Sequence, residues 1–216
     1  MQKEIKRLKK RIFGLEETAY SDGFSLVAGG DEAGRGPWAG PVFAAIVVLP
    51  KDYNLPGLDD SKQLSRDQRR CLFRRIRETA VSIGIGQTTH EEIDRINILE
   101  ATRLAFQRAF ESMVRKPDYL LLDHIILPWL KIPSQSFPKG ESKSDSIAAA
   151  SIIAKESRDL LMEGFEKKYP GYGFGRHMGY GTSIHQEALL KFGVCPIHRR
   201  SFKPIKKIIG SFSGEG

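Results

Sequence analysis

The segment that most constrains the fold is residues 26–36. It begins with an apolar run, which ends in two adjacent acids, Asp31 and Glu32. Its aliphatic residues are typical of a buried strand. Two carboxylates at the end of such a strand repel one another unless a cation lies between them. We therefore expect a rigid element that holds both acids side by side, with either Arg35 or a divalent cation to neutralise them.

The next residues, Gly34-Arg35-Gly36, are suited to contact an anion, because glycine lets the backbone approach closely and arginine binds phosphate. They do not form a dinucleotide-binding fingerprint. That motif opens a helix, whereas here Pro37 and Pro41 bracket a turn that leads into the apolar run 42–49. The sequence also lacks a Gly-Lys-Ser/Thr box, which argues against a nucleoside triphosphatase. Acids for a cation beside a phosphate contact suggest phosphodiester chemistry.

Length and charge limit the number of domains and the kind of partner that the chain suits. The 216 residues are 40% hydrophobic, enough for one domain with at most a small appendage. The net charge is +8, and basic residues gather at 3–11 and 198–207. That excess favours a polyanionic partner, although a solvated charged surface explains either cluster alone equally well.

Cysteine content and hydropathy bear on location. Cys71 and Cys195 are the only cysteines, so the chain is no disulfide scaffold and a reducing cytoplasm is expected. The N-terminus has charges without an apolar stretch behind them, and the longest apolar runs, such as 42–49, are too short to span a bilayer. Neither secretion nor membrane insertion is expected.

Periodicity and capping residues predict an α/β domain on a mixed sheet. The first two strands are close enough to pair antiparallel across the turn at 31–41. Helix N-caps are expected at Ser65, Thr89 and Asn97, and a short, loosely attached helix is expected over residues 5–15. The predicted strands are 24–31, 42–49, 81–87, 119–123 and 134–138, and the predicted helices are 65–79, 90–95, 97–115, 142–168 and 184–192.

Further carboxylates stand at the ends of predicted elements. Asp123 closes the strand 119–123, and Glu141 and Asp145 lie at the start of the long helix. Hard oxygen ligands in this number suit Mg²⁺ or Mn²⁺ rather than zinc. Each has an ordinary alternative, since strand-end aspartates often cap turns and first-turn acids favour the helix dipole.

Residues 171–182 alternate glycines with aromatic and basic residues. Such a segment can lay rings against sugars or bases and amides against phosphates. The alternative is a mobile surface loop anchored by two aromatic rings.

Together these segments resemble the ribonuclease HII family, the type 2 ribonucleases H. The resemblance covers residues 24–204, and its pieces occur in the family's order. They are Asp-Glu-Ala-Gly-Arg-Gly at 31–36, Asp-Ser-Lys at 60–62, Leu-Leu-Asp at 121–123, the small-residue run 146–155 with Arg158-Asp159, His-Met-Gly-Tyr-Gly-Thr at 177–182 and His-Arg-Arg-Ser-Phe at 198–202.

The resemblance implies a ribonuclease-H-like fold, a mixed five-stranded sheet flanked by helices with a C-terminal helical extension. We expect a basic N-terminal segment at 1–22, a catalytic domain at 23–168 and a substrate-binding extension at 169–216. The implied activity is endonucleolytic hydrolysis of RNA in RNA–DNA hybrids and of duplex DNA on the 5′ side of embedded ribonucleotides. The products would carry a 3′-hydroxyl and a 5′-phosphate, and the chain is expected to be a monomer.

The same resemblance implies the site residues. The family's catalytic acids, which hold two divalent cations, Mg²⁺ or Mn²⁺, match Asp31, Glu32, Asp123 and Glu141. Its substrate contacts match Gly34, Arg35, Gly36, Lys62 and Tyr180. One position departs from the pattern, because the family usually has aspartate where this chain has Glu141, so Asp145 is an alternative ligand.

Two other interpretations stay open at the level of sequence. A junction resolvase or transposase-like nuclease also uses clustered acids with Mg²⁺, but it would cut all-DNA substrates. A non-catalytic hybrid-binding module would bind equally well in EDTA, although the intact set of acids speaks against it.

Overall fold

The structure is a computed structural model that describes residues 14–58 and 64–213. Its centre is a five-stranded sheet in the order β3-β2-β1-β4-β5. β1 pairs antiparallel with β2 and parallel with β4, β2 pairs antiparallel with β3, and β4 pairs parallel with β5. The expected mixed sheet is therefore confirmed. The strands are β1 Val27–Ala33, β2 Val42–Val48, β3 Ser82–Thr88, β4 Tyr119–Asp123 and β5 Ser134–Phe137.

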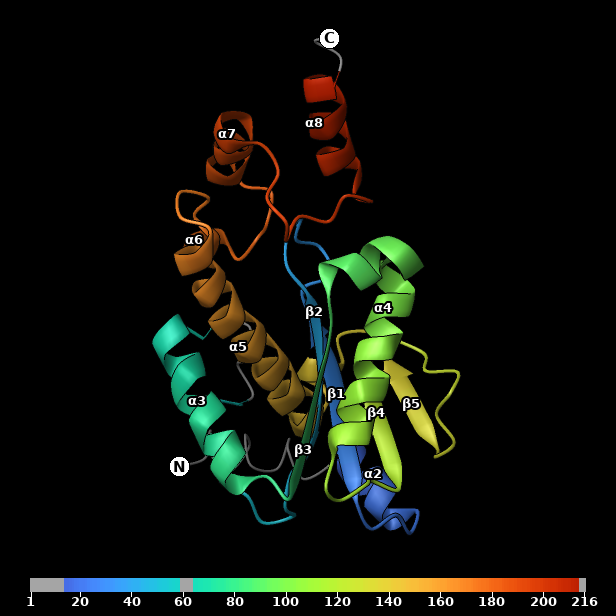
Figure 1. The fold of residues 1–216 in the computed structure, drawn as a ribbon. Helices are drawn as coiled ribbons and strands as arrows, with labels where there is room; N and C mark the ends of the chain where they lie inside the picture. The colour runs from blue at the N-terminus through green and yellow to red at the C-terminus, as the bar shows by residue number, and fades with distance from the viewer. Residues whose placement is uncertain (1–13, 59–63, 214–216) are drawn as a thin grey trace.

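Helices cover both faces of the sheet (Figure 1). α4 packs on one face, α5 packs on the other with α3 beside it, and α6 to α8 lie beyond one end of the sheet. None of the helices within 14–58 and 64–213 is both long and apolar enough to cross a membrane. The helices are α2 Leu15–Ser21, α3 Arg66–Thr79, α4 His90–Ser112, α5 Asp145–Lys168, α6 Phe174–His177, α7 Ser183–Phe192 and α8 Lys203–Ser213, with a 3₁₀ turn η2 at Gly140–Ser142.

β2 explains why the sheet needs two covering layers, since every one of its residues is buried. Alternate side chains point to opposite faces of a strand. Ala44 and Ile46 join the core beneath α4, whereas Ala45 and Val47 join the core beneath α3 and α5. A strand that is apolar on both faces is stable only when both faces are covered.

Small residues let the long helix α5 pack closely against the sheet. Ala148, Ala149 and Ala150 of α5 are fully buried. At Gly29 of β1, an added Cβ would stand only 2.1 Å from the backbone N of Ile147. Glycine at this position therefore sets the distance between β1 and the start of α5, where several of the candidate acids lie.

Gly29→Ala should lower the unfolding free energy by about 3 kcal/mol and the melting temperature by about 6–10 °C, because backbone rather than a flexible side chain blocks the methyl group. The matched control is Gly164→Ala in α5, where an added Cβ meets nothing within 4 Å. It should stabilise the helix by about 0.5–1 kcal/mol. Thermal melts of both variants check the pair, and equal melting temperatures would contradict the account of the packing.

The predicted caps are confirmed. Ser65 and Thr89 each form a capping box, with Gln68 and Glu92 respectively. The two helices predicted on either side of residue 96 form one kinked helix, α4, in which Asn97 has φ 67°. The Asn97 carboxamide oxygen accepts from the backbone N–H groups of residues 99 and 100, as an N-cap does.

Several boundaries differ from expectation. β1 runs two residues past Asp31, and α5 begins at Asp145 rather than at 142, because η2 intervenes. The helices α6 and α8 were not expected. Most of the predicted helix at 5–15 lies outside the described residues. α2 is anchored to the domain, because Ala19 is buried and the Glu16 carboxylate accepts from the backbone N–H of Ser146.

Candidate active site

Two of the candidate acids lie next to each other because their strands are parallel neighbours. Gly30 of β1 pairs with Leu122 of β4. The next residue on each strand is therefore an acid, Asp31 on β1 and Asp123 on β4. Glu32 follows Asp31 on the same strand. The sheet thus gathers three carboxylates from two strands, as the strand-end pattern predicted.

Electrostatics at this end of the sheet disfavour the ionised acids. Asp31 is only 8% exposed, and burial, followed by repulsion from Glu32, raises the pKa of its carboxyl well above the usual range. The backbone N–H of Glu32 donates to Asp31 Oδ1 at 2.7 Å and offsets part of that cost. Burial also raises the pKa of Glu32, and the Arg35 guanidinium opposes the rise through an ion pair of 3.0 Å. Arg35 therefore offsets only part of the cost of ionising these two acids, and the pKa values of both carboxyls stay raised.

The chemistry of this group suits a hard cation. Arg35 contacts Glu32 Oε1, while Glu32 Oε2 is buried and has no hydrogen-bond partner among the described residues. A buried, unsatisfied carboxylate oxygen is costly unless a ligand completes its coordination. Within 14–58 and 64–213, no three acidic, histidine or cysteine side chains converge into a ready-made metal cluster. The carboxylate oxygens of this group are nevertheless the kind of donor that Mg²⁺ or Mn²⁺ prefers.

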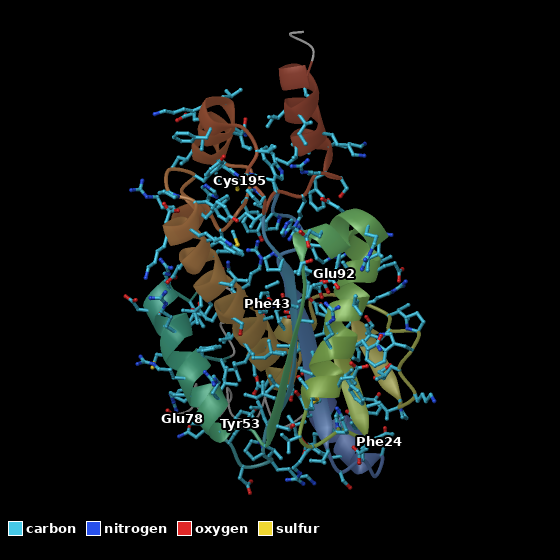
Figure 2. All side chains as sticks on the ribbon, in the orientation of Figure 1. Phe24, Phe43, Tyr53, Glu78, Glu92 and Cys195 are labelled. Atoms are coloured by element: carbon cyan, nitrogen blue, oxygen red, sulfur yellow. The ribbon has the colours of Figure 1, made fainter. Side chains whose placement is uncertain are left out.

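The structure separates the two candidates for the fourth acid. Gly140 N–H donates to Asp123 Oδ1 at 2.8 Å, so Glu141 follows a residue that is bonded directly to the acid pair. Asp145 begins α5, and its Oδ2 accepts a hydrogen bond from the hydroxyl of Tyr53. Tyr53 is labelled in Figure 2. The backbone at Glu141 is thus tied to Asp123, whereas the Asp145 carboxylate is engaged by Tyr53.

Two buried arginines hold the turn that follows the acids, and sequence reasoning gave neither a role. Arg158 of α5 donates to the carbonyl oxygens of residues 39, 41 and 178. Arg199 donates to the carbonyl oxygens of residues 34, 35, 40 and 41 over 2.6–3.1 Å. Burial lowers the pKa of Arg158 to about 10 and that of Arg199 to about 9. A signal was present, since both arginines stand inside family segments, but Arg199 was grouped with the basic cluster at 198–207, which predicts either a polyanion contact or solvated charge.

This bonding fixes the direction of the loop amides. In a trans peptide the C=O and the following N–H point in opposite directions. The carbonyls of Gly34 and Arg35 turn toward Arg199, so the N–H groups of Arg35 and Gly36 turn away from it. Gly34 has φ +100°, and an added Cβ would stand 2.2 Å from Arg158 Nε. Glycine is therefore required here both for backbone conformation and for space.

A cavity of about 310 Å³ brings several predicted residues together. Its lining combines the acid Glu32, the Gly-Arg-Gly turn and Tyr180 with three residues of α5. The Tyr180 ring lies against Gly36, where an added Cβ would be 3.5 Å from the ring, and 44% of Tyr180 is exposed. Lys62 lies outside the described residues. The full lining is Glu32, Ala33, Gly34, Arg35, Gly36, Ser151, Lys155, Arg158 and Tyr180.

The glycine-aromatic segment is a packed core rather than a mobile loop. Tyr172 and Phe174 are buried and stack at 5.3 Å with an angle of 3° between their rings. They belong to a cluster that includes Cys195, labelled in Figure 2. An added Cβ at Gly181 would stand 2.1 Å from the Trp38 ring, so this glycine permits the segment to pack against the loop 34–41.

A chain of hydrogen bonds through two buried histidines connects this core to Tyr180. His185 Nδ1 contacts the Tyr180 carbonyl at 2.9 Å, so that nitrogen carries a proton. The Cys195 N–H donates to His198 Nδ1 at 2.9 Å, so the His198 proton is on Nε2. His198 Nε2 then donates to His185 Nε2 at 3.0 Å. Both rings are neutral in this arrangement, and burial lowers the pKa of each to about 4.

These two histidines make stability fall in acid. Their pKa values are about 4 in the folded chain, against 6.5 for an ordinary histidine. Between those values the unfolded chain binds more protons, so the unfolding free energy decreases as the pH falls. Melts at fixed ionic strength should show the melting temperature dropping from pH 7 to pH 5. His185→Gln should lower the melting temperature at pH 7 and flatten this slope, because it removes one of the two titrating rings. A slope that His185→Gln leaves unchanged would contradict the assignment.

Comparison with known proteins gives consistent matches. The sequence model of the family described as ribonuclease HII matches residues 28–205. A ribonuclease HII of Geobacillus sp. (strain WCH70) is 50% identical over 208 residues, which cover 96% of this chain and 75% of that protein. Among solved structures, the ribonuclease H2 from Pyrococcus horikoshii OT3 superposes with a TM-score of 0.75 at 28% identity, covering 88% of this chain and 100% of that one.

A more distant likeness supports the fold alone. Bst-RNase HIII, solved in complex with Mn²⁺, has a TM-score of 0.67 at 19% identity, over 86% of this chain and 70% of that one. The expected fold class, a mixed five-stranded sheet flanked by helices, is confirmed by these neighbours and by the strand order.

Proposed function

The chain belongs to the ribonuclease HII family, and we propose on that basis that it is a metal-dependent endoribonuclease acting on RNA–DNA hybrids. The observation that carries the proposal is the group of acids at the ends of β1 and β4, next to a cavity lined by the Gly-Arg-Gly turn. Buried acids with raised pKa values in such a place are typical of a functional site. The choice of Mg²⁺ or Mn²⁺ rests on the carboxylate oxygens that this group offers.

We assign the catalytic and metal-binding roles to Asp31, Glu32, Asp123 and Glu141. We prefer Glu141 to Asp145 because Gly140 is bonded to Asp123, whereas the Asp145 carboxylate is bonded to Tyr53. Two divalent cations at these acids would supply Lewis acidity and neutralise charge at the reacting phosphate. The protein's own contribution is to hold the acids on adjacent strands before substrate arrives, so that little reorganisation remains.

The turn and the C-terminal extension would bind the nucleic acid. The outward N–H groups of Arg35 and Gly36 are suited to phosphate or to a 2′-hydroxyl, and the Tyr180 ring to the sugar. We propose Lys62, which lies outside the described residues, as a phosphate contact. Tyr180 and Arg199 both come from 169–216, so we assign this extension a part in substrate binding. We assign 23–168 as the catalytic domain and 1–22 as a basic segment.

We extend the proposal to single ribonucleotides embedded in duplex DNA, as the family resemblance implies. A single ribonucleotide within duplex DNA differs from its neighbours only by the 2′-hydroxyl, so the site must contact that group directly. We propose cleavage on its 5′ side, leaving a 3′-hydroxyl and a 5′-phosphate. A monomeric state and a cytoplasmic location stay predictions.

The test uses three end-labelled duplexes, namely duplex DNA with one internal ribonucleotide, the same duplex without it, and a continuous RNA–DNA hybrid. Each is incubated in Mg²⁺, in Mn²⁺ and in EDTA. Metal-dependent cutting of the first and third substrates, with the all-DNA duplex intact, supports the proposal. Cutting of the all-DNA duplex would indicate a resolvase-like or transposase-like nuclease, and equal binding with no cutting would indicate a binding module.

A further inference from the structure

We propose that Lys155 is a phosphate-binding residue of the active-site cavity, an inference that rests on the proposed function and extends it. Lys155 lines the same cavity as Glu32, the Gly-Arg-Gly turn and Tyr180. It lies on α5 one turn after Ser151, which also lines the cavity, since residues four apart share a face of a helix. The ligand is a backbone phosphodiester of the bound nucleic acid.

The Lys155 side chain is held in place by a carboxylate one turn further along α5. Its Nζ contacts Asp159 Oδ1 at 2.7 Å, and Asp159 is itself buried. Arg69 Nη2 of α3 lies 3.5 Å from the other oxygen of Asp159, so this carboxylate is fixed between two helices. An ammonium group has three N–H donors, and the Lys155 side chain is 34% exposed. The bond to Asp159 therefore orients the ammonium and leaves donors for a ligand.

The other cations that line the cavity have different partners. The Arg158 guanidinium bonds to three carbonyls of the protein, and Arg35 is paired with Glu32. The Lys155 ammonium keeps donors beyond the one that Asp159 engages, so a polyanion entering the cavity is the partner that it suits.

The alternative is an ordinary surface pair, Lys155 with Asp159 at i and i+4, which would contribute little to anything but local helix stability. Salt dependence separates the two. A lysine that neutralises one phosphate adds about 0.9 to the slope of log K against log salt concentration, because it displaces condensed counterions. A surface pair adds nothing to that slope.

The experiment measures binding of the duplex with one ribonucleotide, in EDTA to prevent cleavage, over a series of NaCl concentrations. Lys155→Met keeps the apolar stem and removes the charge, so it should weaken binding about tenfold and reduce the slope by about 0.9. Lys155→Arg should restore the slope. The matched control is Lys167→Met, an exposed residue three helical turns further along α5, which should change neither quantity.

Each outcome decides the matter. An unchanged slope for Lys155→Met, or an equal decrease for Lys155→Met and Lys167→Met, would overturn the proposal. If Lys155→Met is poorly folded by circular dichroism, Lys155→Gln takes its place, because it also removes the charge but keeps a polar side chain. An unchanged slope for Lys155→Gln would overturn the proposal, and a slope reduced by about 0.9 would support it. Failure of the proposed function shows separately, as absence of cutting by the wild type in Mg²⁺ or Mn²⁺.

Discussion

Asp31→Asn is expected to lower kcat by about 10³-fold or more while raising the melting temperature. The catalytic loss follows because an amide replaces a buried anionic ligand at the centre of the acid group. The gain in stability follows from the raised pKa of this carboxyl, since burial and repulsion from Glu32 make its ionised form costly at neutral pH. Initial rates and thermal melts measured in EDTA and in Mn²⁺ check both parts.

Rate and melting temperature together separate a loss of catalysis from a loss of folding. The exposed Asp22→Asn is the matched control and should leave rate and melting temperature unchanged. Mn²⁺ should raise the melting temperature of the wild type more than that of Asp31→Asn, because a ligand that binds only the folded chain stabilises it and the variant binds fewer ions. An Asp31→Asn enzyme with near-normal turnover, or one that loses activity only because it unfolds, would contradict the role given to Asp31.

Arg199→Met is expected to lower the unfolding free energy by about 4 kcal/mol and the melting temperature by about 10 °C. The carbonyl oxygens of residues 34, 35 and 40 would lose their Arg199 donor inside the protein, whereas the carbonyl of Pro41 would keep its hydrogen bond from Arg158 Nε. Buried acceptors without a donor carry the full cost of their desolvation. The melting temperature of Arg199→Lys should lie between those of the wild type and Arg199→Met, because an ammonium has fewer donors than a guanidinium and cannot reach all four carbonyls at once.

The neighbouring Arg200 provides the control. Its side chain is exposed, and its backbone N–H donates to Asp94 Oδ2 at 2.8 Å. Arg200→Met should therefore change the melting temperature by less than about 2 °C. Calorimetry on the three variants tests the contrast. Equal melting temperatures for Arg199→Met and Arg200→Met would show that the guanidinium does not hold the turn.

The parts of the fold that follow local rules were predictable from sequence. β4 occupies the predicted residues, and the caps at Ser65, Thr89 and Asn97 stand where side-chain chemistry favours them. The positions of Asp31 and Asp123 were inferred from strand ends, and the parallel pairing of β1 with β4 explains why they meet. Pairing of distant strands came from the family resemblance and could not be inferred from periodicity.

The parts that depend on long-range packing were not predictable. Arg199 looks like surface charge in sequence, and only the fold shows that it is buried against carbonyls far away in the chain. The segment 171–182 looks mobile because of its glycines, yet Gly181 is required by close packing against Trp38. α6 has only four residues, too few for a periodic signal, and it depends on tertiary contacts for its stability.

Metal binding itself tests the central claim most directly. Wild type and Asp31→Asn are titrated with Mn²⁺ in the presence of uncleavable all-DNA duplex, and bound ions are counted by electron paramagnetic resonance. The account predicts two bound ions per wild-type chain and the loss of at least one in Asp31→Asn, with Asp22→Asn like wild type. Identical titrations of wild type and Asp31→Asn would show that the acids at the ends of β1 and β4 do not form the metal site.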